Sequence, residues 1–397
     1  MRTHGEQYRR THHPCAAQQK VMRHVVECRT AALGGHTEQC DGCGQTRVCY
    51  NSCRDRHCPK CQSTARAEWL EARLNRLLPV PYFHVVFTLP QEINALALAH
   101  PKMIFDLLFH TAAATLLQIA ADPKHLGAHI GFTAVLHTWG QNLLFHPHLH
   151  CVVTGGGLSP DGQRWLTTRK QFFLPVKVLS RLFRGKFLGA LQTAYLAGQL
   201  HFAGSTAELQ YPACWRRWLA ALYRRRWVVY AKPPFAGPEQ IFRYLGRYTH
   251  RVAISNHRLV AFHRGRVSFV VKDYTAAGKS KLLTLDAVEF IRRFLLHVLP
   301  KGYTRIRHFG LCAGRNLSTK LGAARRLLPA TTFRPHTVSS TDPAQRPWWQ
   351  RFLDRTGIDL LACPRCASGR FVRQRDIPPL RSSYLPAIRG VYVTNTS

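Results

Sequence analysis

The stretch HTWGQNLLFHPHLHCVVTGGG, residues 137–157, decides the expected fold of the centre of this 397-residue chain. Apolar and β-branched residues predict strands at 132–137 and 148–154, and the polar residues between them predict a turn. Two strands so close in the sequence are expected to form an antiparallel hairpin. The three glycines at 155–157 are expected to end the second strand and to leave room for a substrate.

Histidines on this hairpin predict a metal site. Side chains two positions apart point to the same face of a strand, so His148 and His150 can direct their nitrogens at one ion, while Leu149 anchors the other face in the core. A lone His-apolar-His triplet is weak evidence, because paired surface histidines are common. His137 precedes His148 by eleven residues and can reach the same ion from the neighbouring strand. Gln141 and His146 are the alternative third ligands if His137 only packs in the core.

Strand-like and helix-like segments alternate around this hairpin. The segment 82–89 reads as a buried strand that stops at Pro90, and 93–121 reads as a helix pair or a helix kinked at Pro101. Further helices are expected at 174–200, 215–227 and 285–298, and a three-stranded meander at 252–272. This order predicts an α+β fold with a central, largely antiparallel sheet flanked by helices.

Two tyrosines, Tyr244 and Tyr248, lie four residues apart in a segment (239–250) that reads as helix. At that spacing both hydroxyls share one face and can approach one metal-bound phosphate. The alternative is that both rings belong to an apolar stripe in the core. A wholly buried stripe would not need the charged residues that this segment carries. Cations surround the pair at Arg243, Arg247, His250 and Arg251. They can attract phosphate and favour the ionised phenol.

Eight of the 13 cysteines lie between residues 15 and 61, several of them in CxxC pairs. Two such pairs separated by about fifteen residues match a tetrahedral zinc site, which predicts one structural zinc ion. The expected ligands of that ion are Cys40, Cys43, Cys58 and Cys61. A possible second zinc site would use Cys28, His36, Cys53 and His57. The alternative is that these four are ordinary buried or exposed side chains.

Two further features accompany the cysteines. Arg54 and Arg56 stand inside the cysteine-rich segment and are expected to contact DNA phosphates. Near the end of the chain, Cys363 and Cys366 form half a zinc site. Completing it would need Cys312 or a histidine from elsewhere, and two free thiols are the alternative.

The charge of the chain indicates a polyanionic partner. Against 56 Lys and Arg there are 20 Asp and Glu, a formal net charge of +36. No uninterrupted apolar run reaches the 18 residues of a membrane-spanning helix, and the start of the chain has no apolar signal core, so no membrane partner is expected. Composition divides the chain into a zinc-binding, DNA-contacting segment (1–78), a catalytic segment (79–330) and a C-terminal tail with the CxxC pair (331–397).

These residues together resemble a known family, the two-tyrosine HUH transposases of rolling-circle insertion sequences (the insertion sequence 91 family). The matching stretches are CRTAALGGHTEQCDGCG, YNSCRDRHCPKCQ, HVVFTLP, HTWGQNLLFHPHLHCVVTGGG, YLGRYTHRVAISNHRL and FIRRFLLHVLPKGYTRIRHFG. The resemblance implies a zinc-binding domain before an HUH nuclease core. It also implies that His148 and His150 are the HUH pair, that Tyr244 and Tyr248 are nucleophiles, and that FTLP at 87–90 lies on a core strand beside the metal site.

The activity expected from this resemblance is rolling-circle transposition. A divalent ion, Mg²⁺ or Mn²⁺, would be held by His137, His148 and His150, and a tyrosine would cut single-stranded DNA to leave a 5′-phosphotyrosine. Transposon ends and target are the expected DNA, and the bacterial cytoplasm, at the nucleoid, is the expected location. The alternatives are a rolling-circle replication initiator or relaxase, and a non-enzymatic zinc-finger DNA-binding protein.

Overall fold

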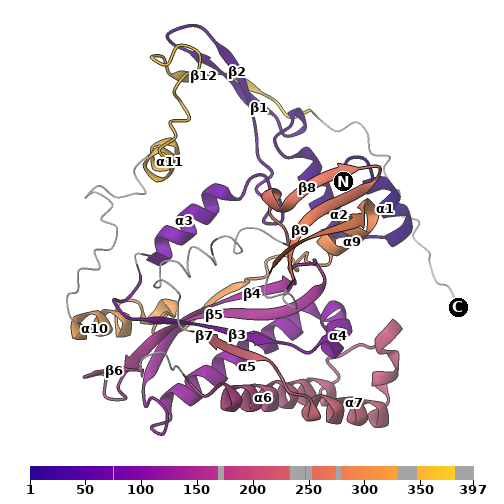
Figure 1. Ribbon diagram of the computed structural model, residues 1–397, viewed down its shortest axis with the longest axis vertical. Helices are drawn as coiled ribbons and strands as arrows, with labels where there is room; N and C mark the ends of the chain where they lie inside the picture. Colours follow the sequence, from indigo (N-terminus) through magenta and orange to yellow (C-terminus); the bar gives the residue numbers. More distant parts are fainter. Residues whose placement is uncertain are drawn as a thin grey trace, which may run out of the picture.

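A six-stranded antiparallel sheet forms the centre of the computed structural model (Figure 1). The structure describes residues 1–74, 76–168, 174–232, 246, 253–273, 279–328 and 347–380. The strand order is β11-β4-β5-β3-β7, with β6 paired to β5. The strands are β3 (Tyr82–Thr88), β4 (His129–Trp139), β5 (Phe145–Leu158), β6 (Trp165–Thr167), β7 (Val229–Lys232) and β11 (Ile306–Gly310). The α+β class expected from the sequence is confirmed.

Four helices cover one face of this sheet: α4 (Asn94–Ala99), α5 (Pro101–Ala121), α6 (Val176–Leu196) and α7 (Pro212–Arg224) (Figure 1). Pro101 divides the expected helix pair because proline lacks the backbone N–H that a helix interior needs, whereas the first turn tolerates it. Phe87 and Leu149 of the sheet pack in one core with Phe183 of α6. By length and composition α5 could cross a membrane, yet 61% of its most apolar stretch is buried within the protein.

The opposite face of the sheet is covered by α3 (Ser63–Leu74) and α10 (Lys320–Leu327). Its core includes Val135 of β4 and Val152 of β5. Because side chains alternate along a strand, His150, which pairs with Val135, shares this face. The expected metal histidines therefore point away from the layer of α4 to α7.

The triglycine does not end β5. The strand continues to Leu158, and β6 pairs along Gly156 and Gly157. A Cβ on Gly156 would lie 2.5 Å from the Leu166 carbonyl oxygen, and one on Gly157 would lie 2.4 Å from that of His129. The glycines let neighbouring backbones approach closely, so the expectation that they leave room for a substrate was wrong.

A second unit combines the N-terminus with a distant part of the chain (Figure 1). Helices α1 (Gly5–His12), α2 (Ala16–Glu27) and α9 (Ala287–Leu295) pack on a sheet of β8 (Leu259–His263), β9 (Arg266–Asp273) and β10 (Lys279–Asp286). Its core holds Met22, Phe269 and Leu295. The expected meander is correct for two strands, but residues 253–255 are not a strand, because Ala253 has a φ of +64°.

The third sheet joins the two ends of the chain (Figure 1). Strands β1 (Gly35–Cys40) and β2 (Thr46–Tyr50) form a hairpin, and β12 (Phe371–Ile377) pairs antiparallel with β1. Helix α11 (Trp348–Thr356) precedes β12. Short 3-10 helices lie at Ala31–Leu33, Gln91–Ile93, Gly204–Gln210, Asn256–Arg258 and Gly314–Asn316.

Candidate active site and metal centres

Three histidines converge on the β4–β5 hairpin. His137 of β4 stands directly opposite His148 of β5, and His150 follows two positions later on the same face. The Nε2 atoms of His148 and His150 are 3.0 Å apart, and the ring centres of His137 and His150 are 4.3 Å apart. Nitrogens of all three side chains lie within 4.8 Å of one another. His146, one of the alternative third ligands, lies outside this group, and the other alternative, Gln141, stays a prediction.

The surroundings keep these imidazoles neutral. Burial lowers the pKa of His148 to about 4, and it holds the pKa values of His137 and His150 well below their ordinary range. A neutral imidazole has one nitrogen lone pair to offer a cation. The carbonyl oxygen of His146 can only accept, so His148 donates its Nδ1 proton to that oxygen at 2.6 Å. This fixes the tautomer of His148 and leaves its Nε2 lone pair facing His150.

The donor set fits a divalent metal ion. Two nitrogens bound at right angles to one ion, each at about 2.1 Å, lie roughly 3 Å apart, which matches the distance between the Nε2 atoms of His148 and His150. Imidazole nitrogen suits Zn²⁺, Fe²⁺ and neighbouring transition ions, and Mn²⁺ accepts it more readily than Mg²⁺, which prefers oxygen. Three protein ligands leave positions for oxygens of a substrate phosphate.

A fourth histidine, His84 of β3, supports the group and was missed by the sequence analysis. Its Nε2 lies 2.7 Å from Nδ1 of His150, and the two rings are nearly parallel and meet edge to edge, with centres 5.0 Å apart. Burial lowers the pKa of His84 to about 4, so it is neutral and can accept the His150 proton. The signal was present in HVVFTLP: Val86 pairs with His150, and His84, two residues earlier, shares its face.

Side chains from α9, from the residues that follow it and from the 3-10 helix before β8 hold the turn of the hairpin. His297 is buried; its Nδ1 contacts the Thr138 hydroxyl at 3.2 Å and its Nε2 lies 3.1 Å from the carbonyl oxygen of Leu143. Arg293 donates to the Asn142 carbonyl oxygen at 3.0 Å. Arg258 donates to the carbonyl oxygen of Gln141. Hydrogen bonds to backbone carbonyls fix this turn and therefore the spacing of His137 and His148.

Arg305 brings a buried cation to the edge of the site. The residue is 6% exposed, and its Nη1 atom has no hydrogen-bond partner among the described residues. Its carbonyl oxygen accepts a hydrogen bond from the amide of Leu136, the neighbour of His137. Burial lowers the pKa of Arg305 to about 9, so it remains charged at neutral pH. A buried guanidinium with an unused donor is suited to receive an anion.

The expected nucleophiles cannot be placed. Tyr244 and Tyr248 lie outside the described residues, as do the expected DNA-contacting residues Arg243, Arg247 and Arg251. Of the other two expected DNA contacts, Arg54 is exposed, whereas Arg56 donates to the Tyr303 carbonyl oxygen at 2.6 Å. Arg56 therefore joins the N-terminal segment to the residues before β11.

The cysteines form two four-sulfur groups, and neither is the expected set. One group contains Cys28, Cys53, Cys58 and Cys61. The other contains Cys40, Cys43, Cys363 and Cys366. The expected grouping of Cys40 and Cys43 with Cys58 and Cys61 is corrected by this geometry. The cause is the β1–β2 hairpin, which carries Cys40 and Cys43 to its tip, roughly 17 Å along the strand from the Gly35–Tyr50 pair at its base.

The two histidines of the expected second zinc site do not join the cysteines. His57 Nδ1 bonds Asp55 at 2.9 Å, and its Nε2 accepts the Leu299 amide at 3.3 Å. His36 Nε2 bonds Glu38 at 3.0 Å, in a small group with Cys49. Both imidazoles are used in local hydrogen bonds, whereas Cys28 and Cys53 join Cys58 and Cys61 in one group.

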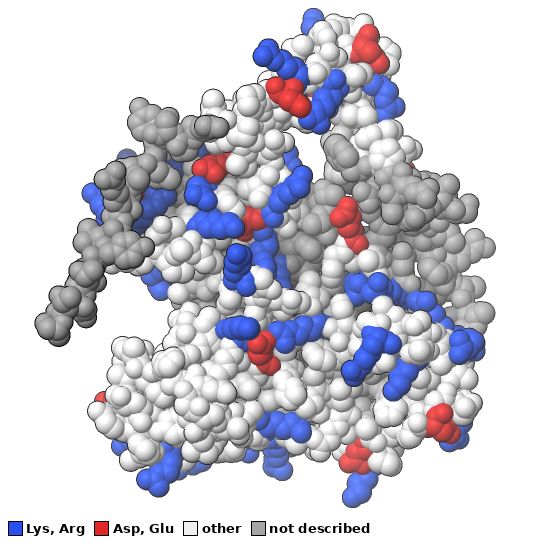
Figure 2. Space-filling view, turned by 180° about the vertical axis from the view of Figure 1, so that it is seen from behind, with Lys and Arg blue, Asp and Glu red and all other residues white. Residues whose placement is uncertain are grey.

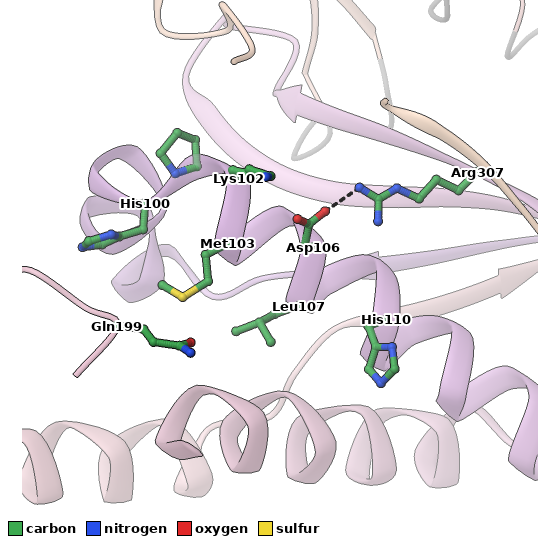
Figure 3. A pocket seen from close by; sticks show the side chains of 9 residues that line it. His100, Lys102, Met103, Asp106, Leu107, His110, Gln199 and Arg307 are labelled. Atoms are coloured by element: carbon green, nitrogen blue, oxygen red, sulfur yellow. Dashed lines mark hydrogen bonds and ion pairs between the residues drawn. The ribbon is translucent and has the colours of Figure 1, made fainter. Parts of the chain in front are cut away.

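A hollow of about 740 Å³ lies on the α5 side of the sheet (Figure 3). Residues of α5 line it together with Arg307 of β11, which pairs with Asp106. The Arg307 guanidinium also lies 4.3 Å from the ring centre of Phe109 on α5. The sheet separates this hollow from the face that carries His137, His148 and His150.

Comparison with known proteins identifies the class. Residues 131–320 match a family model described as a putative transposase, and residues 1–89 match a model described as a transposase zinc-binding domain. A putative transposase named y4qJ from Sinorhizobium fredii is 53% identical over 372 residues, which cover 94% of this chain and 92% of that protein. The transposase for insertion sequence element IS801 from Pseudomonas savastanoi pv. phaseolicola is 30% identical over 303 residues, covering 75% and 70%. No solved structure matches the chain.

The fold and these similarities define a transposase. More particularly, the chain belongs to the family of insertion sequence 91 transposases, which confirms the resemblance found in the sequence. DNA is therefore its partner, and the zinc-binding domain and cysteine groups support structural zinc.

Proposed function

We propose that this transposase cuts and rejoins single-stranded DNA through a 5′-phosphotyrosine ester beside a divalent metal ion. The observation that carries the proposal is the convergence of His137, His148 and His150 on one face of the central sheet, with two Nε2 atoms 3.0 Å apart. When bound, the divalent ion polarises the scissile phosphate and fixes the in-line geometry of attack. The three imidazoles bind the ion, and His84 orients His150.

Arg305 assists by binding a phosphate oxygen. Its charge is one of the lesser causes, after burial, that lower the pKa of His137, and its Nη1 is buried without a partner among the described residues. A phosphate would satisfy that donor with a charge-assisted hydrogen bond. The charge on a pentacoordinate phosphate is greater than on the ground-state diester, so the guanidinium stabilises the transition state more than the substrate.

Tyr244 or Tyr248 acts as the nucleophile. The phenolic oxygen forms a bond to phosphorus as the bond from phosphorus to the 3′ oxygen breaks, and the 3′ oxygen gains one proton for the proton that the phenol loses. The phosphotyrosine ester keeps the energy of the phosphodiester, so a later attack by a 3′-hydroxyl rejoins DNA without ATP. The second tyrosine can accept the other strand. This assignment rests on the sequence motif, because both residues lie outside the described part of the chain.

The charge distribution supports a nucleic-acid strand as substrate. The chain has a formal net charge of +36, and Lys and Arg side chains are spread over the face shown in Figure 2, with few acidic ones between them. A strand neutralised by many cations binds with an affinity that falls steeply with salt. An unpaired strand can bend its backbone into a site on a sheet face more easily than a stiff duplex.

End-labelled single-stranded oligonucleotides carrying the element's ends test the proposal. With Mn²⁺ or Mg²⁺, the fragment downstream of the cut should become linked to the protein, and the upstream fragment should end in an extendable 3′-hydroxyl. His148→Ala and the double variant Tyr244→Phe, Tyr248→Phe should abolish cleavage while DNA binding persists. His146→Ala is the matched control, since it keeps the backbone carbonyl that His148 uses. Cleavage that survives either change rejects the mechanism.

A further inference from the structure

The two CxxC pairs at opposite ends of the chain meet in one four-sulfur group. Cys40 Sγ lies 3.6 Å from Cys366 Sγ, and Cys43 Sγ lies 3.7 Å from Cys363 Sγ. The pairs are separated by 320 residues or more, which include the whole catalytic sheet. The expectation that Cys312 or a histidine would complete the site of Cys363 and Cys366 does not agree with this placement.

The distances between sulfurs match a tetrahedral zinc site. Four thiolates, each about 2.3 Å from a zinc ion, lie roughly 3.8 Å apart. A disulfide would require about 2.05 Å, so these sulfurs are too far apart for a bond and at the separation that a shared ion sets. Each sulfur also lies within 4.8 Å of the other three.

The two pairs form the same kind of turn. The amide of Gly44 donates to the Cys40 carbonyl oxygen at 3.0 Å, and the amide of Ala367 donates to that of Cys363 at 3.0 Å. In both turns the residue after the second cysteine has a positive φ, +72° at Gly44 and +58° at Ala367. The left-handed backbone conformation is unfavourable for alanine, so the surrounding structure must hold Ala367 in it. Such turns direct two thiolates the same way, as a metal knuckle requires.

Backbone contacts lock the two turns against each other. The amide of Asp41 donates to the carbonyl oxygen of Arg370 at 3.1 Å, and the Arg370 amide donates to the Asp41 carboxylate at 2.7 Å. Gly369 allows this approach, because a Cβ there would lie 2.4 Å from Cys40 Sγ. The Gly369 amide also donates to Cys366 Sγ at 3.3 Å, which stabilises a thiolate.

We propose that Cys40, Cys43, Cys363 and Cys366 bind a second zinc ion, which clasps the C-terminal strand β12 onto β1. The family's zinc-binding region ends at residue 89, so half of this site lies outside it. The other cysteine group, with Cys28 and Cys53, completes its own site within the first 61 residues. Zinc therefore closes the chain into a loop and sets the position of β12.

Zinc counts on the full-length protein test the clasp. The variants Cys40→Ser with Cys43→Ser, and Cys363→Ser with Cys366→Ser, should each hold one zinc ion fewer per chain than the control Cys15→Ser with Cys214→Ser. Cys15 and Cys214 belong to neither four-sulfur group. Combining both cysteine pairs in one variant should also remove only one ion, because the pairs share it. An unchanged count in the C-terminal variant, or a loss of two ions in the combined variant, overturns the proposal.

Alkylation of the wild-type protein gives a second answer that needs no folded variant. Cys43 is exposed, so burial does not shield it from a thiol reagent. With zinc present, Cys43 and Cys366 should resist alkylation while exposed Cys15 reacts. After a chelator removes the zinc, Cys43 and Cys366 should both react, and hydrogen exchange in β12 should increase. Rapid alkylation of Cys43 in the zinc-loaded protein contradicts the clasp. Neither readout depends on DNA cleavage, so the clasp and the proposed reaction fail independently.

Discussion

His84 Nε2 lies 2.7 Å from His150 Nδ1, and the two rings meet edge to edge with their planes within 9° of parallel. Metal-binding histidines generally donate their second ring proton to an acceptor that fixes ring orientation, most often a carboxylate or a carbonyl oxygen. Here the acceptor is a second neutral imidazole on the adjacent strand. The hydrogen-bond partner of His150 therefore comes from β3, outside the segment that carries His148 and His150.

Replacing His84 should weaken metal binding without removing a ligand. We expect His84→Leu to raise the Mn²⁺ concentration for half-maximal cleavage about 10- to 100-fold. His84→Gln, whose amide oxygen can still accept the proton, should recover most of the loss. The measurement is a metal titration of cleavage at saturating DNA. Equal defects in both variants, uncorrected by excess metal, would indicate that His84 only packs.

The all-imidazole donor set predicts a preference among metals. Cleavage should stop in chelator and return at lower concentrations of Mn²⁺ than of Mg²⁺, because nitrogen ligands favour transition ions and Mg²⁺ favours oxygen. Rates measured across a titration of each ion check this. Full activity after exhaustive chelation would mean that His137, His148 and His150 hold no catalytic ion.

Arg305 should contribute to activity at the expense of stability. The Nη1 of Arg305 has no partner among the residues that the structure describes, so Arg305→Met relieves a desolvation cost and should keep or raise the melting temperature. Cleavage should fall about tenfold or more, the effect of losing one charge-assisted hydrogen bond. Thermal unfolding and cleavage rates of the same preparation decide the matter. A strongly destabilised variant would show that Arg305 is a structural residue.

Stability should fall in mild acid, in part through His297. Burial lowers its folded pKa to about 4, below the ordinary value of 6.5, so the unfolded chain binds the proton more readily. The stabilisation is complete above about pH 6.5 and is lost as the pH falls toward 4. Between pH 7 and pH 5 the titration of His297 should lower the free energy of unfolding by about 2 kcal/mol. Urea unfolding at both values should show a smaller pH difference in His297→Gln, and an equal difference excludes the assignment.

The sequence predicted the parts of the fold and site that depend on local pattern. Alternation along 148–154 and the short spacing to His137 were enough to expect the hairpin, because side-chain direction in a strand repeats every two residues. Pro101 predicted the break between two helices for an equally local reason. The helix with Tyr244 and Tyr248 stays a prediction, since it lies outside the described residues.

The cysteine grouping could not be predicted from spacing. Ligands of the two sites interleave along the chain, because the β1–β2 hairpin is inserted between Cys28 and Cys53 and carries Cys40 and Cys43 away from them. The remaining half, at Cys363 and Cys366, is more than 300 residues distant. Spacing rules apply to cysteines within one continuous segment. They cannot predict that β12, near the C-terminus, pairs with β1 and brings two more cysteines to the site.

The most direct test of the central claim is mass spectrometry of the protein after reaction with single-stranded DNA and Mn²⁺, followed by nuclease and protease digestion. The account predicts a peptide in which Tyr244 or Tyr248 carries a 5′-phosphate nucleotide, and none in His148→Ala. A nucleotide on any other side chain, or cleavage with no adduct at all, would contradict it.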